Sequence, residues 1–329
     1  MVFLFRDKSF INIFFLTVLS IGVHFHFLIE APQIDTNSSS NDGLLSLILD
    51  RYILSLPGSV RFLLYHALIL VQAIRLNVAM NELRMYPSNT FVPAMTYVLL
   101  TAMLPQWCAI SPALVTNSLV IWIFIKLSRL YNHPSPKTLL FNTGLIAGLS
   151  VICYHPMAIL IGVVLFALAV VRPFRLAEWL VLLIGVVLPY YFVLSILYLT
   201  DRLPAIGSML PDFYLGLPAG SNDQTLPWGL SYLALILLLG LFFWQVSIGR
   251  MVIQIRKNWG VMMVLLLTLL PVPFIFQLGG LESGLLALVP ISAFASNLFG
   301  NPRNMSLPNL LFLLAVAVIA MNNWQLLKN

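Results

Sequence analysis

KTLLFNTGLIAGLSVICYHPMAILIGVVLFALAVVR, from Lys137 to Arg172, gives the first indication of the fold of this chain. Positions 138–171 of this stretch, 34 residues, contain no Asp, Glu, Lys or Arg. One bilayer crossing takes about 20 apolar residues, and two minimal crossings take about 17 each. His155-Pro156 brings a titratable side chain and a helix-breaking proline together in the middle of the run. The stretch therefore predicts two membrane helices that turn at His155.

Basic residues at both ends of this hairpin predict its orientation. Lys137 precedes the first helix, and Arg172 and Arg175 follow the second. Short loops with clustered Lys and Arg face the cytoplasm. We therefore expect the turn at His155 to face outward and, counting spans back along the chain, the N-terminus to be cytoplasmic.

The composition of the whole chain indicates the same class of protein. Of 329 residues, 60% are hydrophobic and 9% are charged, against roughly 25% charged in soluble domains. No polar segment is long enough for a separate soluble domain of about 100 residues, so we expect residues 1–329 to form a single transmembrane domain. The net charge of +6 comes from residues beside apolar runs, which is typical of topology signals and argues against nucleic acid as a partner.

Apolar runs along the chain predict an all-α, polytopic transmembrane helical bundle of eleven spans. In this topology 13 of the 17 Lys and Arg residues lie on the inner side, which is the bias expected of cytoplasmic loops. The last run is the weakest, so ten spans with an inner C-terminus remain open. The spans lie at about 10–29, 60–80, 91–104, 109–125, the two halves of 138–171, 178–200, 228–248, 261–277, 284–299 and 307–324.

Two long outer loops follow from this topology, at residues 30–58 and 201–227. Residues of about 44–54 are apolar but short and interrupted by charge, which predicts an interfacial helix on the outer surface. The second loop is rich in Pro and Gly and is expected to be a lid or binding loop. Eight of the 11 acidic residues fall on the outer side, so we take the outer face as the candidate reaction face.

Asp35 and Asp42, in the first outer loop, are the candidate catalytic residues. A carboxylate at a membrane boundary suits a general base or, alternatively, a ligand for a divalent ion. Arg51, Arg61 and Arg202 are the outer guanidiniums of this topology. Because a guanidinium binds phosphate through two parallel hydrogen bonds, these arginines are candidate phosphate-binding residues.

This arrangement resembles, in architecture, the polytopic glycosyltransferases of the GT-C type. The resemblance implies sugar transfer from a polyprenyl-phosphate-linked donor on the outer face, with a catalytic carboxylate in the first outer loop. Asp42 is the first position to carry that role and Asp35 the second. The pair of acids one residue apart that many such enzymes share is absent from this chain.

Histidines near the outer span ends are candidate metal ligands. His24 and His26 are two residues apart, so on a helix they point about 200° from each other and do not chelate one ion together. His66 and His155 would have to complete such a site from other spans, and we expect hydrogen bonding instead and no metal or other cofactor. Cys108 and Cys153 both fall near outer loops; two unpaired thiols are expected, with a disulfide as the alternative. Nucleotide-binding, GxSxG and HExxH motifs are absent.

The inner side carries a second polar group at Arg75, Glu82 and Arg84. Arg75 and Glu82 are seven residues apart and share one helix face, which predicts an ion pair that locks the second and third spans together. The alternative is an inner gate or proton path. Gly144 and Gly148 form a GxxxG pattern, which predicts close packing against a neighbouring helix.

Several stretches resemble an uncharacterised multi-pass inner-membrane family of Bacteroidota. The resemblance implies a bacterial inner membrane, and that family carries no established activity that could be transferred to this chain. Membrane lipids are the expected partners. The function expected from the residues is envelope glycan or lipid-linked sugar transfer; the alternative is a non-catalytic transporter or an assembly subunit, of open oligomeric state. The stretches are NELR (81–84), PAMTY (93–97), PKTLLFNTGLIAG (136–148), RPFRLAEW (172–179) and PYYF (189–192).

Overall fold

A computed structural model describes most of the chain. The described residues are 2–7, 9–34, 43–131, 133–203, 210–211, 213, 215–217, 226–276, 280–300 and 305–326, without the side chains of Asp50 and 324–326. The described part is helical except for turns, connecting segments and one short parallel pair, in which β1 (Gln33–Ile34) lies beside β2 (Ala109–Ile110).

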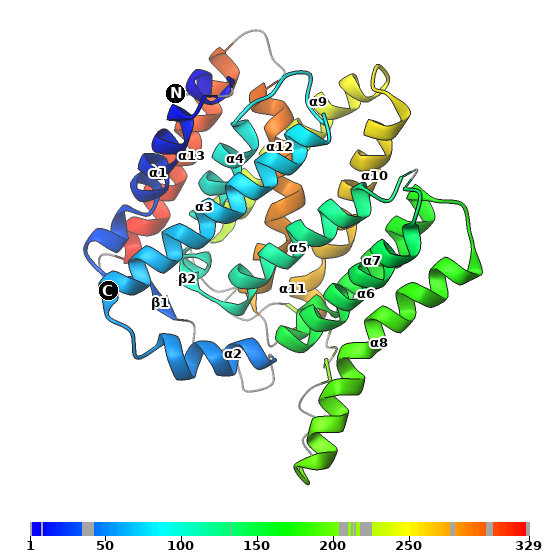
Figure 1. The fold of residues 1–329 in the computed structure, drawn as a ribbon. Helices are drawn as coiled ribbons and strands as arrows, with labels where there is room; N and C mark the ends of the chain where they lie inside the picture. The colour runs from blue at the N-terminus through cyan, green and yellow to red at the C-terminus, as the bar shows by residue number, and fades with distance from the viewer. Residues whose placement is uncertain are drawn as a thin grey trace.

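Eleven helices correspond one to one with the predicted spans (Figure 1). Among the described residues, seven helical segments are long and apolar enough to cross a membrane, and four further apolar helices are shorter. The predicted class, an all-α polytopic bundle, is therefore confirmed. The helices are α1 (Ile11–Val23), α3 (Gly58–Glu82), α4 (Val92–Thr101), α5 (Pro112–Ser128), α6 (Pro136–Cys153), α7 (Ile159–Val171), α8 (Leu176–Leu199), α9 (Leu226–Ile248), α10 (Ile253–Leu269), α12 (Leu288–Gly300) and α13 (Ser306–Leu326).

Short helical turns connect or extend these helices. They are η1 (Val2–Phe5), η2 (Phe25–Leu28), α2 (Leu44–Ile48), the π-helical η3 (Leu49–Ile53), η4 (Pro105–Trp107), η5 (His155–Ala158), α11 (Val272–Ile275) and η7 (Leu281–Ala287).

The hairpin predicted around His155 is confirmed. Tyr154 is extended, with φ −152° and ψ 113°, and ends α6, after which η5 carries Pro156 and leads into α7. The close packing predicted for Gly144 and Gly148 is also found, and α8 is the helix that packs against them. A side chain on Gly148 would overlap the Val186 carbonyl oxygen, and one on Gly144 would overlap a carbonyl in the same part of α8.

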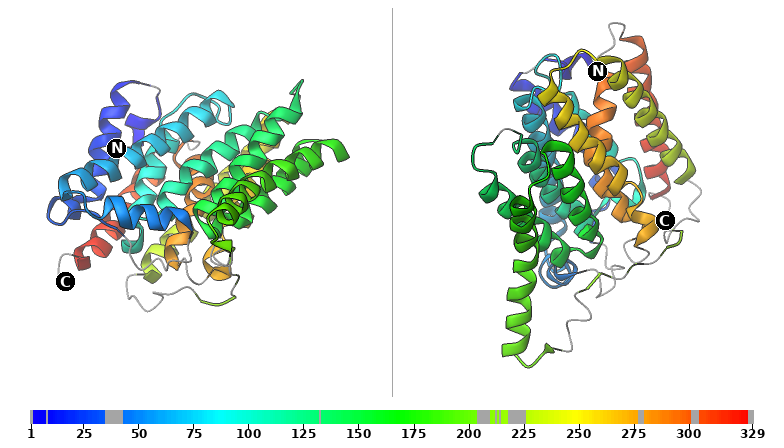
Figure 2. Two further views of the ribbon diagram at one scale, coloured as in Figure 1. Left: turned by 60° about the horizontal axis from the view of Figure 1, so that its bottom comes forward. Right: turned by 90° about the vertical axis from the view of Figure 1, so that its right-hand side faces the viewer.

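Helices α4 and α12 occupy the centre of the bundle (Figure 1). Every residue from Val92 to Thr101 is buried, and so is every residue from Leu288 to Phe299. Serines on α12 hydrogen-bond to carbonyls of their own helix, as Ser296 Oγ does to Ser292 O. Helix α8 lies at the edge instead, and its second half extends past the other helices (Figure 2).

Loops predicted on the inner side meet at one end of the bundle, which we call the basic end. Phe91 N donates to Phe5 O at 2.8 Å, and Lys257 Nζ donates to Val171 O at 2.8 Å. The described basic residues on the loops and helix ends of this end are Arg6, Arg84, Lys126, Arg129, Lys137, Arg172, Arg175, Arg250, Arg256 and Lys257.

Loops predicted on the outer side meet at the opposite end, which we call the hairpin end because it holds the α6–α7 turn. Trp107 Nε1 donates to Leu281 O at 2.9 Å, and Asn322 Nδ2 donates to Met103 O at 2.7 Å. The second of these bonds places the last part of α13 at this end, in agreement with eleven alternating helices. The sorting of loops to two sides is thus confirmed, whereas the assignment of the cytoplasmic side stays a prediction.

The interfacial segment predicted at 44–54 is helical. It consists of α2 followed by η3, and α2 crosses the hairpin end at an angle to the long helices (Figure 1). Gly43, just before α2, has a φ of +116° and leaves room for the backbone of Cys153 at the end of α6. A side chain at position 43 would meet the Cys153 carbonyl oxygen at 2.6 Å, so this glycine allows the segment to lie on the bundle.

Candidate functional site

The loop that carries the candidate carboxylates is attached to the bundle on both sides. Asp35 and Asp42 themselves lie outside the described residues. Immediately before them, Gln33 and Ile34 pair with β2, and immediately after them Gly43 packs on Cys153. The two described residues that flank this segment, Ile34 and Gly43, therefore both lie at the hairpin end.

Two of the predicted phosphate-binding arginines lie on consecutive elements at the same end. The guanidinium of Arg51, on η3, lies 5.8 Å from the ring centroid of Tyr52. Arg61, in the first turn of α3, is half-buried, and its buried Nε has no hydrogen-bond partner among the described residues. Pro57 precedes α3 and provides no side-chain cap. The N-terminus of α3 and Arg61 together thus present uncapped donors, an arrangement that favours an anion.

Arg202 and His155 occupy other places at the hairpin end. Arg202 is exposed and follows the end of α8, which lies apart from the start of α3 (Figures 1 and 2). The structure therefore does not bring Arg202 to Arg61. His155 is buried at the start of η5. It lies two residues after Cys153, whose backbone contacts Gly43.

His66 belongs to a buried polar network between α1 and α3. Its Nδ1 lies 2.9 Å from Ser20 Oγ, and the Nδ1 of His24 lies 2.9 Å from Ser20 O. His24 Nε2 lies 3.0 Å from the Tyr65 hydroxyl. Within the described part of the chain, no group of three His, Cys, Asp or Glu has a geometry suited to a metal ion. This network joins helices by hydrogen bonds, as predicted for these histidines.

The predicted ion pair between Arg75 and Glu82 is wrong. Glu82 pairs instead with Arg129 at the end of α5, at 3.0 Å. Seven residues separate Arg75 from Glu82, about 10 Å along a helix, so sharing a face does not bring the charges together. The pair links the second and fourth spans. Arg84 is exposed in the turn after α3, with a φ of 51°, and contributes to no site.

Replacing Glu82 is expected to have little effect on stability. Both partners of this ion pair are 56% exposed, and exposed pairs contribute less than about 1 kcal/mol. Glu82→Gln should therefore leave the unfolding temperature in detergent nearly unchanged. Glu178→Gln is the matched comparison, because Glu178 is buried and pairs with Arg172 at 3.2 Å. This change should lower the unfolding temperature more than Glu82→Gln does. An equal effect of the two changes would contradict this ranking.

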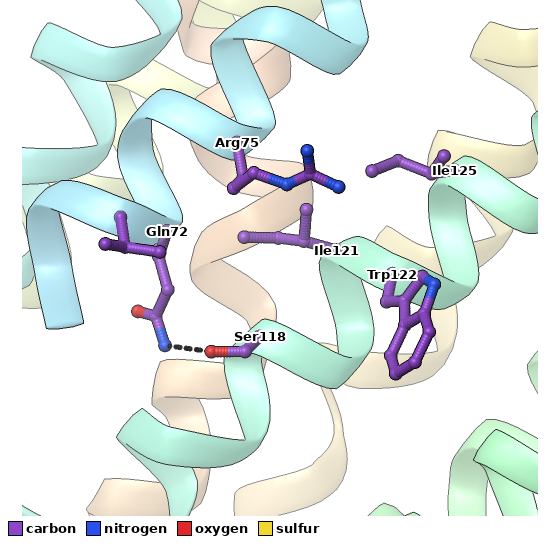
Figure 3. Close-up of a pocket in the computed structure, with 7 residues that line it drawn as sticks. Gln72, Arg75, Ser118, Ile121, Trp122 and Ile125 are labelled. Carbon is purple, nitrogen blue, oxygen red and sulfur yellow. Dashed lines mark hydrogen bonds between the residues drawn. The ribbon is translucent and has the colours of Figure 1, made fainter.

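Arg75 lines a groove between α3 and α5 (Figure 3). The groove has a volume of about 280 Å³, close to the lower limit of about 300 Å³ for small-molecule sites. Arg75 is recognisable in the sequence as a charge in an apolar helix, whereas Ser118 and Trp122 carry no such signal. The lining residues are Val71, Gln72, Arg75, Ser118, Ile121, Trp122 and Ile125.

The two cysteines are free thiols, as expected. Cys108 is buried, with Sγ 3.6 Å from Leu104 O, and Cys153 is partly buried. The disulfide alternative is therefore not supported.

The fold and these sites define a multi-pass α-helical membrane protein. A comparison of the chain with protein-family models, curated proteins and solved structures finds no match. The resemblances to the Bacteroidota family and to GT-C glycosyltransferases therefore remain predictions from sequence.

Proposed function

We propose that the protein transfers a sugar from a polyprenyl-phosphate-linked donor at the hairpin end, on the outer face of a bacterial inner membrane. The main support is that the described residues on both sides of Asp35 and Asp42 lie at the hairpin end, Ile34 beside β2 and Gly43 against Cys153. Arg51 and Arg61 lie at the same end of the bundle as these two flanking residues.

The proposed reaction uses a negatively charged carboxylate as the base and a positively charged guanidinium to bind the phosphate. The carboxylate of Asp42 accepts the proton of an acceptor hydroxyl while the oxygen of that hydroxyl forms a bond to the anomeric carbon of the sugar. The bond from that carbon to the phosphate oxygen breaks, and polyprenyl phosphate leaves. Arg61 and the N-terminus of α3 stabilise the charge on the departing phosphate. Asp35 is the second candidate for the base.

Arg51→Gln and Arg61→Gln are expected to raise the KM for the donor about tenfold each, because a hydrogen bond to a charged group contributes about 1.5–3 kcal/mol. The measurement is release of polyprenyl phosphate from a synthetic donor by the purified protein in liposomes. Arg202→Gln is the matched control, since the end of α8 lies apart from α3, and its KM should stay within about twofold of wild type. Absence of donor turnover by the wild-type protein would contradict the proposal.

The orientation is tested by labelling single cysteines in a background without Cys108 and Cys153. Ser55 is exposed at the hairpin end, and Ser135 is exposed at the basic end. A membrane-impermeant maleimide should label Ser55→Cys in intact spheroplasts and Ser135→Cys only after lysis. The reverse pattern would place the hairpin end in the cytoplasm and remove the proposed reaction from the outer face.

A further inference from the structure

The groove between α3 and α5 contains a cation whose counter-charge is missing from the described protein. None of the hydrogen bonds and ion pairs among the described residues involves Arg75. Glu82, the nearest acid along α3, is paired with Arg129. A cation in a membrane helix is costly unless a partner or the headgroup region compensates it. Arg75 is exposed, so a ligand from outside the protein can reach it and supply the compensating anion.

Besides Arg75, the polar residues that line the groove are Gln72, Ser118 and Trp122. Gln72 Oε1 accepts from the Tyr97 hydroxyl at 2.8 Å, and Gln72 Nε2 donates to Leu114 O at 2.7 Å. Gln72 Nε2 donates to Ser118 Oγ at 2.9 Å, which leaves the Ser118 hydroxyl proton available. Trp122 adds an indole N–H on the next turn of α5 (Figure 3). A group rich in acceptors and negatively charged, such as a phosphate, fits this set of donors.

The walls of the groove indicate that its ligand comes from the membrane. Val71 is 58% exposed and Trp122 is 47% exposed, on helices whose outward side chains face lipid in a membrane protein. Ile121 and Ile125 line the same space. Apolar, lipid-facing walls suit acyl chains, and Trp is enriched at the level of lipid headgroups.

The position of the groove fits the headgroup region of one leaflet. Arg75 lies seven residues before the end of α3, about 10 Å along the helix, and a long arginine side chain can reach toward the interface. In Figure 3 it extends from α3 toward Ile125, the residue before Lys126 on α5. From this geometry we propose that the α3–α5 groove binds the phosphate headgroup of an anionic membrane lipid from the leaflet at the basic end.

This site is separate from the proposed reaction at the hairpin end, so each can fail alone. The test is native mass spectrometry of the protein in a zwitterionic detergent, titrated with phosphatidylglycerol or with phosphatidylcholine. Wild type should retain one phosphatidylglycerol in preference to phosphatidylcholine. Arg75→Gln should weaken this binding about tenfold or more, the loss expected for a hydrogen-bonded charge. Arg256→Gln, an exposed arginine at the same end, should bind as wild type does.

Further variants keep the test decisive if Arg75→Gln does not fold. Ser118→Ala removes one donor with little change in shape, and Trp122→Phe removes one donor while keeping an aromatic ring, so each should weaken binding several-fold. Equal binding by wild type and the donor-deficient variants would overturn the site. Equal weakening by Arg256→Gln would show general charge attraction and would also overturn it. Displacement of the lipid by inorganic phosphate at equal concentration would assign the groove to soluble phosphate and overturn the lipid as its ligand.

Discussion

Asp42→Asn should lower the rate of sugar transfer about a hundredfold to ten-thousandfold, the usual contribution of a positioned general base. An amide has nearly the shape of a carboxylate but does not take the proton of the acceptor hydroxyl. The KM for the donor should change little, because in the proposed site the phosphate is bound by Arg51 and Arg61 and not by Asp42. The measurement is initial rate against donor concentration in proteoliposomes. Asp35→Asn should have the smaller effect if Asp42 is the base.

Asp201→Asn is the matched control for these changes. Asp201 is exposed after the end of α8 at the hairpin end and has a φ of 53°, a conformation that asparagine also tolerates. It should therefore preserve both folding and transfer. Full activity of Asp42→Asn and Asp35→Asn would refute the proposed chemistry. If Arg75→Gln alone then removed the cellular phenotype, the transporter or assembly alternative would be favoured.

Replacing Gly144 and Gly148 together by alanine should destabilise the protein by about 3 kcal/mol, within the range for overpacked interiors. Each new methyl group would overlap a backbone carbonyl of α8, a group that cannot move without the helix. Gly185 faces α6 in the same way, with its nearest neighbour the Phe141 carbonyl oxygen. Helices α6 and α8 would have to separate, and α8 is attached mainly through this contact. The measurement is the unfolding temperature in detergent.

Gly162→Ala provides the control of opposite sign. Gly162 lies in α7 with no atom within 4 Å of the position of a Cβ, so alanine should stabilise the helix by about 0.5–1 kcal/mol. The double change at Gly144 and Gly148 should also release α8, which limited proteolysis near residue 175 would detect. Unchanged stability of the double variant would contradict the observed packing of α6 on α8.

Only part of each candidate site can be predicted from the sequence. Arg75 stood out because a charge within an apolar span is unusual. The groove beside Arg75 cannot be recognised in the sequence, because Ser118 and Trp122 are common residues in a membrane helix. They line a groove only because α5 packs beside α3. Similarly, the sequence placed Arg202 with Arg61 on one side of the membrane, but the end of α8 lies apart from α3 (Figure 1). Two residues on the same side of the membrane can be far apart along its plane, and the sequence pattern does not give that distance.

Sequence alone determined the helices and their alternation. Backbone polar groups have no partner in lipid, so each apolar run must form a helix of sufficient length, and the loop charges divide the loops into two sets. The tertiary structure alone decided which helices are neighbours: Gly148 against Val186, and Glu82 with Arg129. The physical reason is that apolar helix faces are nearly equivalent in lipid. Which helices become neighbours is therefore decided by where backbones can approach closely and by hydrogen bonds between residues distant in sequence.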